Sequence, residues 1–97
     1  MIRHSVIFKL NPSGKDQQDN FFNAARELAQ IPGVQQFECL QQVSKKNNFD
    51  FGLSMEFDTQ QDYDAYSDHA DHQVFIQNWW IPFVEDFLEI DYVVMVE

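Results

Sequence analysis

A strict alternation over residues 49–57 constrains the fold of this chain more than any other feature. The even-numbered positions there are polar or Gly, and the odd-numbered ones are apolar: Phe49, Phe51, Leu53, Met55 and Phe57. A period of two places successive side chains on opposite faces of a β-strand. The segment therefore predicts a strand with one buried and one polar face, which is typical of an antiparallel sheet covered on one side.

Three further strands and two helical regions complete the predicted pattern. The strands cover residues 2–10, 34–43 and 87–96, the second with a less clean alternation. A helical region lies between the first and second strands, and another between the third and fourth. The order β-α-β-β-α-β predicts a ferredoxin-like α+β fold, with both helical regions on one face of a four-stranded antiparallel sheet.

The helix boundaries follow from capping residues and prolines. The first helix is predicted to start at an N-cap on Ser13, to run for roughly 15 residues and to end at Ile31-Pro32-Gly33. The second starts at Asp58-Thr59 and is broken around residues 67–71, where Asp71 is a candidate cap for a further helix. Pro82 is expected to bend or interrupt that last helix.

The alternation also assigns faces to the first and last strands. The even-numbered residues of 2–10, which include His4, form an apolar face that we expect to point toward the helices. The same orientation is expected for Leu88, Ile90, Tyr92, Val94 and Val96. The opposite face then shows Ile7, Val93 and Met95 among polar residues, and apolar side chains on an uncovered face favour a partner subunit.

Charge and cysteine content exclude several classes of function. Sixteen acidic residues against six basic ones give a formal net charge of −10, which disfavours binding to nucleic acid or to an anionic membrane surface. Cys39 is the sole cysteine and cannot form an internal disulfide. No signal peptide or long apolar segment is evident. We therefore expect residues 1–97 to form one cytoplasmic domain.

The candidate chemistry lies in a few aromatic and imidazole side chains. His4 is either a core residue or a pocket residue that contacts a polar ligand group. Tyr66, His69 and His72 follow one another at helical spacing, and a neutral imidazole with a phenol can form an acid–base pair. The alternative is that Tyr66 packs in the core and both histidines are solvated.

Two other readings of this region stay open. His69 and His72, with Asp68 and Asp71 nearby, supply metal-ligand types, but their spacing differs from the helical histidine pair of zinc hydrolases and no distant third ligand is indicated. Trp79 and Trp80 can line an aromatic pocket or pack in the core. We predict no metal and no cofactor.

Five segments, in the right order, resemble the stress-responsive A/B barrel (Dabb) family. They cover nearly the whole chain: Ile2–Leu10, Ile31–Val34, Asp50–Phe57, the motif Tyr66-x-x-His69-x-x-His72-x-x-Phe75, and the run through Ile90-Asp91-Tyr92. The resemblance implies a dimeric α/β barrel, in which the sheets of two subunits pack together. It also implies a small-molecule pocket between the sheet and the helices of each subunit.

The resemblance further implies a chemistry and a set of site residues. Olivetolic acid cyclase, a polyketide cyclase of this family, closes a poly-β-keto chain by aldol condensation without metal or organic cofactor, and its catalytic tyrosine and histidine match Tyr66 and His72. Its first-strand pocket histidine matches His4. Phe51 replaces a third pocket histidine, and Ala70 replaces a proline of the motif. The predicted ligand-binding residues are His4, Phe51, His69 and Trp79.

Three functions are compatible with these features. The leading one is a homodimer that binds an apolar, carbonyl-bearing small molecule. Whether it only binds this ligand or also performs cofactor-independent acid–base chemistry on it stays open. The second is a non-enzymatic, stress-related protein whose useful property is stable oligomerisation. The third is a cofactor-independent monooxygenase of the wider dimeric α+β barrel class, with Trp79 or Trp80 beside His72.

Overall fold

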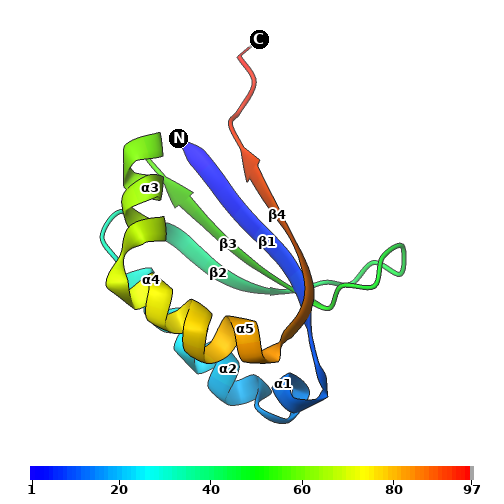
Figure 1. Ribbon diagram of the computed structural model, residues 1–97. Coiled ribbons are helices and arrows are strands. Elements are labelled where there is room, and N and C mark those ends of the chain that lie inside the picture. The colour runs from blue at the N-terminus through cyan, green and yellow to red at the C-terminus, as the bar shows by residue number, and fades with distance from the viewer. Residues whose placement is uncertain (97) are drawn as a thin grey trace.

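The computed structural model describes residues 1–96 as one sheet with helices along one face (Figure 1). The strands are β1 (Ile2–Leu10), β2 (Gln35–Gln41), β3 (Phe51–Phe57) and β4 (Val84–Tyr92). They lie in the order β2-β3-β1-β4, and each neighbouring pair is antiparallel. This is the predicted ferredoxin-like α+β architecture. No helix of residues 1–96 combines the length and apolarity needed to cross a membrane.

The first helical region begins earlier than predicted. α1 (Pro12–Asp16) is capped by Asn11, whose side-chain oxygen accepts the Gly14 N–H at 2.7 Å, so the predicted cap at Ser13 is wrong. Pro suits the first turn of a helix because its missing N–H would have no helical partner there. After a break at Gln17, α2 (Gln18–Arg26) continues into the 3₁₀ turn η1 (Glu27–Gln30).

The second helical region is a chain of short elements. α3 (Gln60–Asp68) starts at Thr59, whose hydroxyl accepts the Asp62 N–H at 3.1 Å. The chain becomes extended at His69, and α4 (Ala70–Phe75) follows. Its N-cap is His69 and not Asp71 as predicted, because extended backbone at His69 lets its Nδ1 accept the Asp71 N–H at 3.1 Å.

The end of this region passes directly into the last strand. A π-type turn, η2 (Ile76–Trp80), leads into α5 (Ile81–Phe83), which holds Pro82 in its first turn, and β4 starts immediately. Asn11 joins the two helical regions: its backbone N–H donates to the Phe83 carbonyl and its side-chain amide to the Pro82 carbonyl, both at 2.8 Å. β4 therefore starts before the predicted residue 87 and ends before residue 96.

Strand β2 is also shorter than the predicted 34–43, and β3 begins at Phe51, not at residue 49. The register of β2 against β3 shifts between Gln35 and Glu38, and Gln36 between them has a positive φ of 51°. Such a bulge interrupts the ladder of an edge strand and discourages pairing with further strands. It explains the unclear alternation of this segment.

The core fills the space between the helices and the covered face of the sheet. Phe8, Phe21 and Phe57 have no exposed surface, and Phe8 lies 4.9–6.1 Å, between ring centroids, from four other aromatic side chains. Tilted and edge-on contacts at such distances add to the apolar area that the rings bury. Five of the ten Phe residues are buried and build a dense core despite the small size of the chain: Phe8, Phe21, Phe22, Phe57 and Phe75.

The face assignment of β4 differs from the prediction. β1 pairs with β4 so that His4 lies opposite Asp91, Val6 opposite Glu89, and Phe8 opposite Phe87. The odd-numbered residues of β4 therefore share the helix-covered face with the even-numbered residues of β1. Leu88, Ile90 and Tyr92 lie on the uncovered face, because the apolar period of β4 is out of phase with that of β1.

Candidate functional site

A cavity of about 340 Å³ lies between the sheet and the second helical region. Its walls come from β1, β3 and β4 on one side and from η1 and the elements α3 to α5 on the other. Most lining side chains are apolar. The full lining is His4, Val6, Leu28, Leu53, Met55, Tyr66, His72, Phe75, Ile76, Trp80, Ile81, Phe87 and Glu89.

Tyr66 reaches the cavity from the last turns of α3. Its side chain is 2% exposed, and its ring centroid lies 4.6 Å from that of His72 and 6.3 Å from that of His4. Burial raises the pKa of the Tyr66 phenol well above 10, and the carboxylate of Glu89 raises it further. Tyr66 therefore carries its proton at neutral pH and can donate a hydrogen bond into the cavity.

His72 faces Tyr66 from α4. Its Nδ1 lies 3.0 Å from the carbonyl oxygen of Ser67, which can only accept, so Nδ1 carries the proton and Nε2 is left for a ligand. That carbonyl is available because the helix is interrupted at His69, and Gln73 Nε2 also donates to it at 2.9 Å. Burial is the main cause that lowers the pKa of His72 below 6.5, so the ring is neutral near pH 7.

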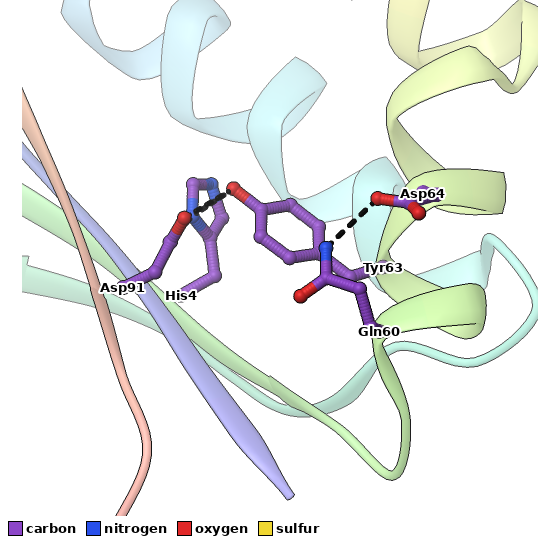
Figure 2. A network of polar contacts seen from close by, with 5 residues as sticks. All are labelled: His4, Gln60, Tyr63, Asp64 and Asp91. Carbon is purple, nitrogen blue, oxygen red and sulfur yellow. Dashed lines mark hydrogen bonds and ion pairs between the residues drawn. The ribbon is translucent and has the colours of Figure 1, made fainter.

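His4, Asp91 and Tyr63 form a polar network beside the cavity (Figure 2). The buried imidazole of His4 projects from β1, and its Nδ1 lies 2.6 Å from Oδ1 of Asp91 on β4. Tyr63, from α3, donates its hydroxyl proton to Oδ2 of Asp91 at 3.0 Å, and its oxygen lies 2.9 Å from His4 Nδ1. The network ties β1, β4 and α3 together.

The predicted site residues divide into two groups. The structure brings His4, Tyr66 and His72 to one cavity. Phe51 instead packs against Phe8 and Phe22, with ring centroids 5.8 and 5.0 Å away. His69 caps α4 at the half-exposed joint with α3. Neither residue lines the cavity.

Trp79 also lies outside this cavity. It lines a separate groove between the two helical regions, whereas Trp80 points into the cavity. The π-type turn Ile76–Trp80 sets this arrangement, because it rotates the side chains relative to a regular α-helix. The predicted four-residue repeat of Phe75, Trp79 and Phe83 assumes a regular helix. It therefore indicated Trp79, and not Trp80, as the pocket residue.

Several residues of the site escaped the sequence analysis. Phe87 and Glu89 line the cavity from β4, and Asp91 and Tyr63 hold His4. The alternation of residues 87–96 contained the signal for the three β4 residues, but it was assigned to the wrong face. Tyr63 precedes Tyr66 by three residues, which places both on one side of α3.

The histidines of the motif do not form a metal cluster. His69 and His72 serve different purposes, one at the helix cap and one at the cavity. Within residues 1–96, no group of three His, Cys, Asp or Glu side chains is placed to hold a metal ion. The chemical groups that the cavity offers are thus two imidazoles, one phenol and the carboxylate of Glu89, set in an apolar wall.

The fold and this cavity define the class of protein: a ferredoxin-like α+β domain with a partly polar pocket under its helices. The model of the Stress responsive A/B Barrel Domain, Dabb, matches residues 2–94, so the chain belongs to that family. The family resemblance predicted from five sequence segments is thereby confirmed, whereas the likeness to olivetolic acid cyclase stays a prediction. No curated protein sequence is similar enough to this chain to count as a match.

Solved structures with the same fold include proteins of several descriptions. A Dabb family protein with a ferredoxin-like fold from Mesorhizobium loti is 45% identical, with a TM-score of 0.92 over 98% of this chain and 97% of that one. A dimeric ferredoxin-like protein of unknown function from Thermobifida fusca is 25% identical, with a TM-score of 0.80 over 96% and 90% of the two chains.

A third similar structure is a hydroxynitrile lyase from Passiflora edulis. It is 15% identical, with a TM-score of 0.85 over 97% of this chain and 93% of that one. This likeness concerns the fold alone.

Proposed function

We propose that this chain binds a small, apolar, carbonyl-bearing molecule and performs acid–base chemistry on it without a cofactor. His72 removes a proton from the carbon next to the carbonyl, and Tyr66 donates a hydrogen bond to the oxygen as negative charge develops there. A neutral imidazole and a protonated phenol are the forms that these two steps require.

One observation carries this proposal: His72 and Tyr66 meet in one cavity, and each is in the protonation state its role needs. The Ser67 carbonyl holds the proton of His72 on Nδ1, which leaves Nε2 as the base. The raised pKa of Tyr66 keeps its hydroxyl a donor. The cavity volume of about 340 Å³ lies at the lower end of the range of ~300–1,000 Å³ for small-molecule sites.

Closure of a poly-β-keto chain, the reaction that the family resemblance implies, starts with this kind of proton removal. Other reactions of enolisable carbonyl compounds start in the same way. The proposal therefore specifies the elementary step and leaves the natural substrate open within that class.

Hydrogen–deuterium exchange tests the elementary step without knowledge of the natural substrate. Propiophenone in D₂O exchanges the protons next to its carbonyl when a base removes them, and proton NMR follows the loss of signal. We expect the protein to accelerate exchange, and His72→Ala and Tyr66→Phe each to reduce the acceleration by about 10²-fold or more. Circular dichroism confirms that both variants fold.

His69→Asn is the matched control, since it removes a histidine of the same motif that lies outside the cavity and keeps a side chain that can accept the Asp71 N–H at the start of α4. It should keep the full exchange rate. Unchanged exchange in both cavity variants would refute the assignment. Oxygen uptake with a quinol in place of ketone exchange would favour the monooxygenase alternative.

We further propose that the chain forms a homodimer through the uncovered face of its sheet. Leu40, Gly52, Ile7 and Leu88 lie side by side across the four strands in one continuous row. Leu88 is 49% exposed and Tyr92 52% exposed on this face. The Thermobifida fusca protein, which shares the fold, is described as dimeric. Burial of such a face is favourable by the area of apolar surface it removes from water.

The same uncovered face supports the second candidate, a non-enzymatic protein that functions as a stable oligomer. Under that hypothesis the cavity is an incidental packing defect. Absence of both proton exchange and ketone binding, in a protein that remains dimeric, would favour it.

A further inference from the structure

In both cavity histidines, His4 and His72, Nδ1 contacts a protein oxygen, which leaves Nε2 for a ligand. We infer that Asp91 and Tyr63 fix His4 in its Nδ1–H tautomer, so that the cavity selects a neutral ligand carrying a hydrogen-bond donor beside its carbonyl group. The inference deepens the proposed function, and rests on it for the position of the ligand in the cavity.

The tautomer of His4 follows from its contact with Asp91. A carboxylate oxygen offers only lone pairs, and it lies 2.6 Å from His4 Nδ1. Without a proton on Nδ1, two lone pairs would face each other at that distance, which is repulsive. Nδ1 therefore donates to Asp91, and in the Nδ1–H tautomer Nε2 is the acceptor that remains.

Tyr63 stabilises the contact between His4 and Asp91 through a second hydrogen bond to Asp91. Its hydroxyl donates to the second oxygen of Asp91 at 3.0 Å, so each oxygen of the Asp91 carboxylate accepts a hydrogen bond within the network. Burial, together with the hydrogen bond to Asp91, raises the pKa of Tyr63 well above 10, so the donor keeps its proton. The phenol oxygen, 2.9 Å from His4 Nδ1, accepts a share of the same imidazole proton.

The cavity consequently has more hydrogen-bond acceptors than donors. His4 Nε2 and His72 Nε2 accept, Glu89 accepts, and Tyr66 alone donates. A ligand with carbonyl groups only would accept from Tyr66 and place its C–H bond at His72, but it would leave Nε2 of His4 without a partner, which costs binding free energy. A hydroxyl or enol next to the carbonyl supplies the missing donor, and Glu89 disfavours an anionic ligand.

Nitrogen NMR tests the tautomer directly and needs no turnover. Two-bond ¹⁵N–¹H correlation spectra distinguish Nδ1–H, Nε2–H and doubly protonated rings, and His4→Gln assigns the signals. We expect His4 of the wild-type protein to show the Nδ1–H form, and Asp91→Ala to shift it toward the Nε2–H form. An Nε2–H or doubly protonated ring in the wild type would overturn the inference.

Two further variants separate positioning from general damage. Tyr63→Phe should cause a smaller shift in the same direction, because Asp91 remains. Glu38→Ala removes an exposed carboxylate from β2, the other edge strand, and should leave the His4 signals unchanged. A His4 ring that keeps its Nδ1–H form in both Asp91→Ala and Tyr63→Phe would contradict the role of these residues.

Ligand titration tests the selectivity with matched probes. Phenacyl alcohol has a hydroxyl beside its carbonyl, and its methyl ether lacks only that donor. We expect the alcohol to bind with a Kd at least about tenfold lower than the ether, and the ratio to fall toward one in Asp91→Ala. Equal affinities in the wild type would refute the selectivity. Loss of propiophenone exchange with the alcohol preference intact would instead refute the proposed reaction alone.

Discussion

His72 shows how one half-buried side chain couples stability to pH. Burial lowers its pKa below 6.5, whereas in the unfolded chain the ring titrates near its ordinary value. As the pH falls through 6.5, the unfolded state takes up a proton that the folded state takes up only at lower pH. The free energy of unfolding therefore falls with the pH in this window, and the contribution vanishes above it.

We expect His72→Gln to weaken the loss of stability between about pH 7 and pH 5. Urea unfolding of the wild type and the variant across this pH range measures the difference. The other titrating groups are present in both proteins, so their contributions cancel in the comparison. The matched control is His69→Gln, which alters a half-exposed histidine. An identical pH dependence for wild type and His72→Gln would contradict the direction of this pKa.

The sequence selected His4, Tyr66 and His72 as candidates, and the structure brings all three to one cavity. The face of the first strand indicated His4, whereas helical spacing indicated Tyr66 and His72 only together with the family resemblance. Asp91 was missed for a physical reason: alternation fixes which residues share a face but not which face is covered. Phe51, His69 and Trp79 depended on the family pattern and on a regular helix, and local packing placed them elsewhere.

Strands and helix starts were predictable where a single signal, either alternation or a capping residue, determined them. Residues 51–57 of the strand predicted over 49–57 are observed as a strand, and the predicted cap at Thr59 is observed. Boundaries shifted where two rules competed: Pro12 enters the first turn and moves the cap from Ser13 to Asn11. The π-type turn before Pro82 depends on the packing of both helical regions, which a single segment does not reveal.

Asn11 provides a prediction at the level of elements. It caps α1 and also binds the Pro82 carbonyl of α5, so Asn11→Ala should lower the free energy of unfolding by about 1–2 kcal/mol. Chemical denaturation measures this value. Ser13→Ala, at the cap predicted from sequence, should change stability by less than about 0.5 kcal/mol. A larger loss for Ser13→Ala than for Asn11→Ala would contradict the observed cap.

At the level of the whole molecule, the order of elements predicted the fold class. The register of β4 against β1 determines which side chains of β4 lie on the uncovered face of the sheet. Leu88, Ile90 and Tyr92 make that surface more apolar than expected. The predicted partner contacts of Val93 and Met95 fall beyond the end of β4, in a segment where they are 70% and 86% exposed.

The proposed dimer is testable through this surface. Leu88→Glu places a carboxylate in the middle of the apolar row, and we expect it to convert the dimer to monomer in analytical ultracentrifugation. Val74→Glu is the matched control, because Val74 is equally apolar and 55% exposed but lies on the helical side. A monomeric wild type, or a dimeric Leu88→Glu variant, would argue against this interface.

The last strand gives the molecule an unusual constraint on how it can evolve. Phe87 and Glu89 line the cavity, Asp91 holds His4, and the residues between them lie on the uncovered face. A slip of one position against β1 would exchange the two sets entirely. Insertion or deletion of a single codon in this strand would thus disrupt the cavity wall and the uncovered face in the same step, and with them the proposed ligand binding and the proposed dimer, whereas a point substitution can alter either surface alone.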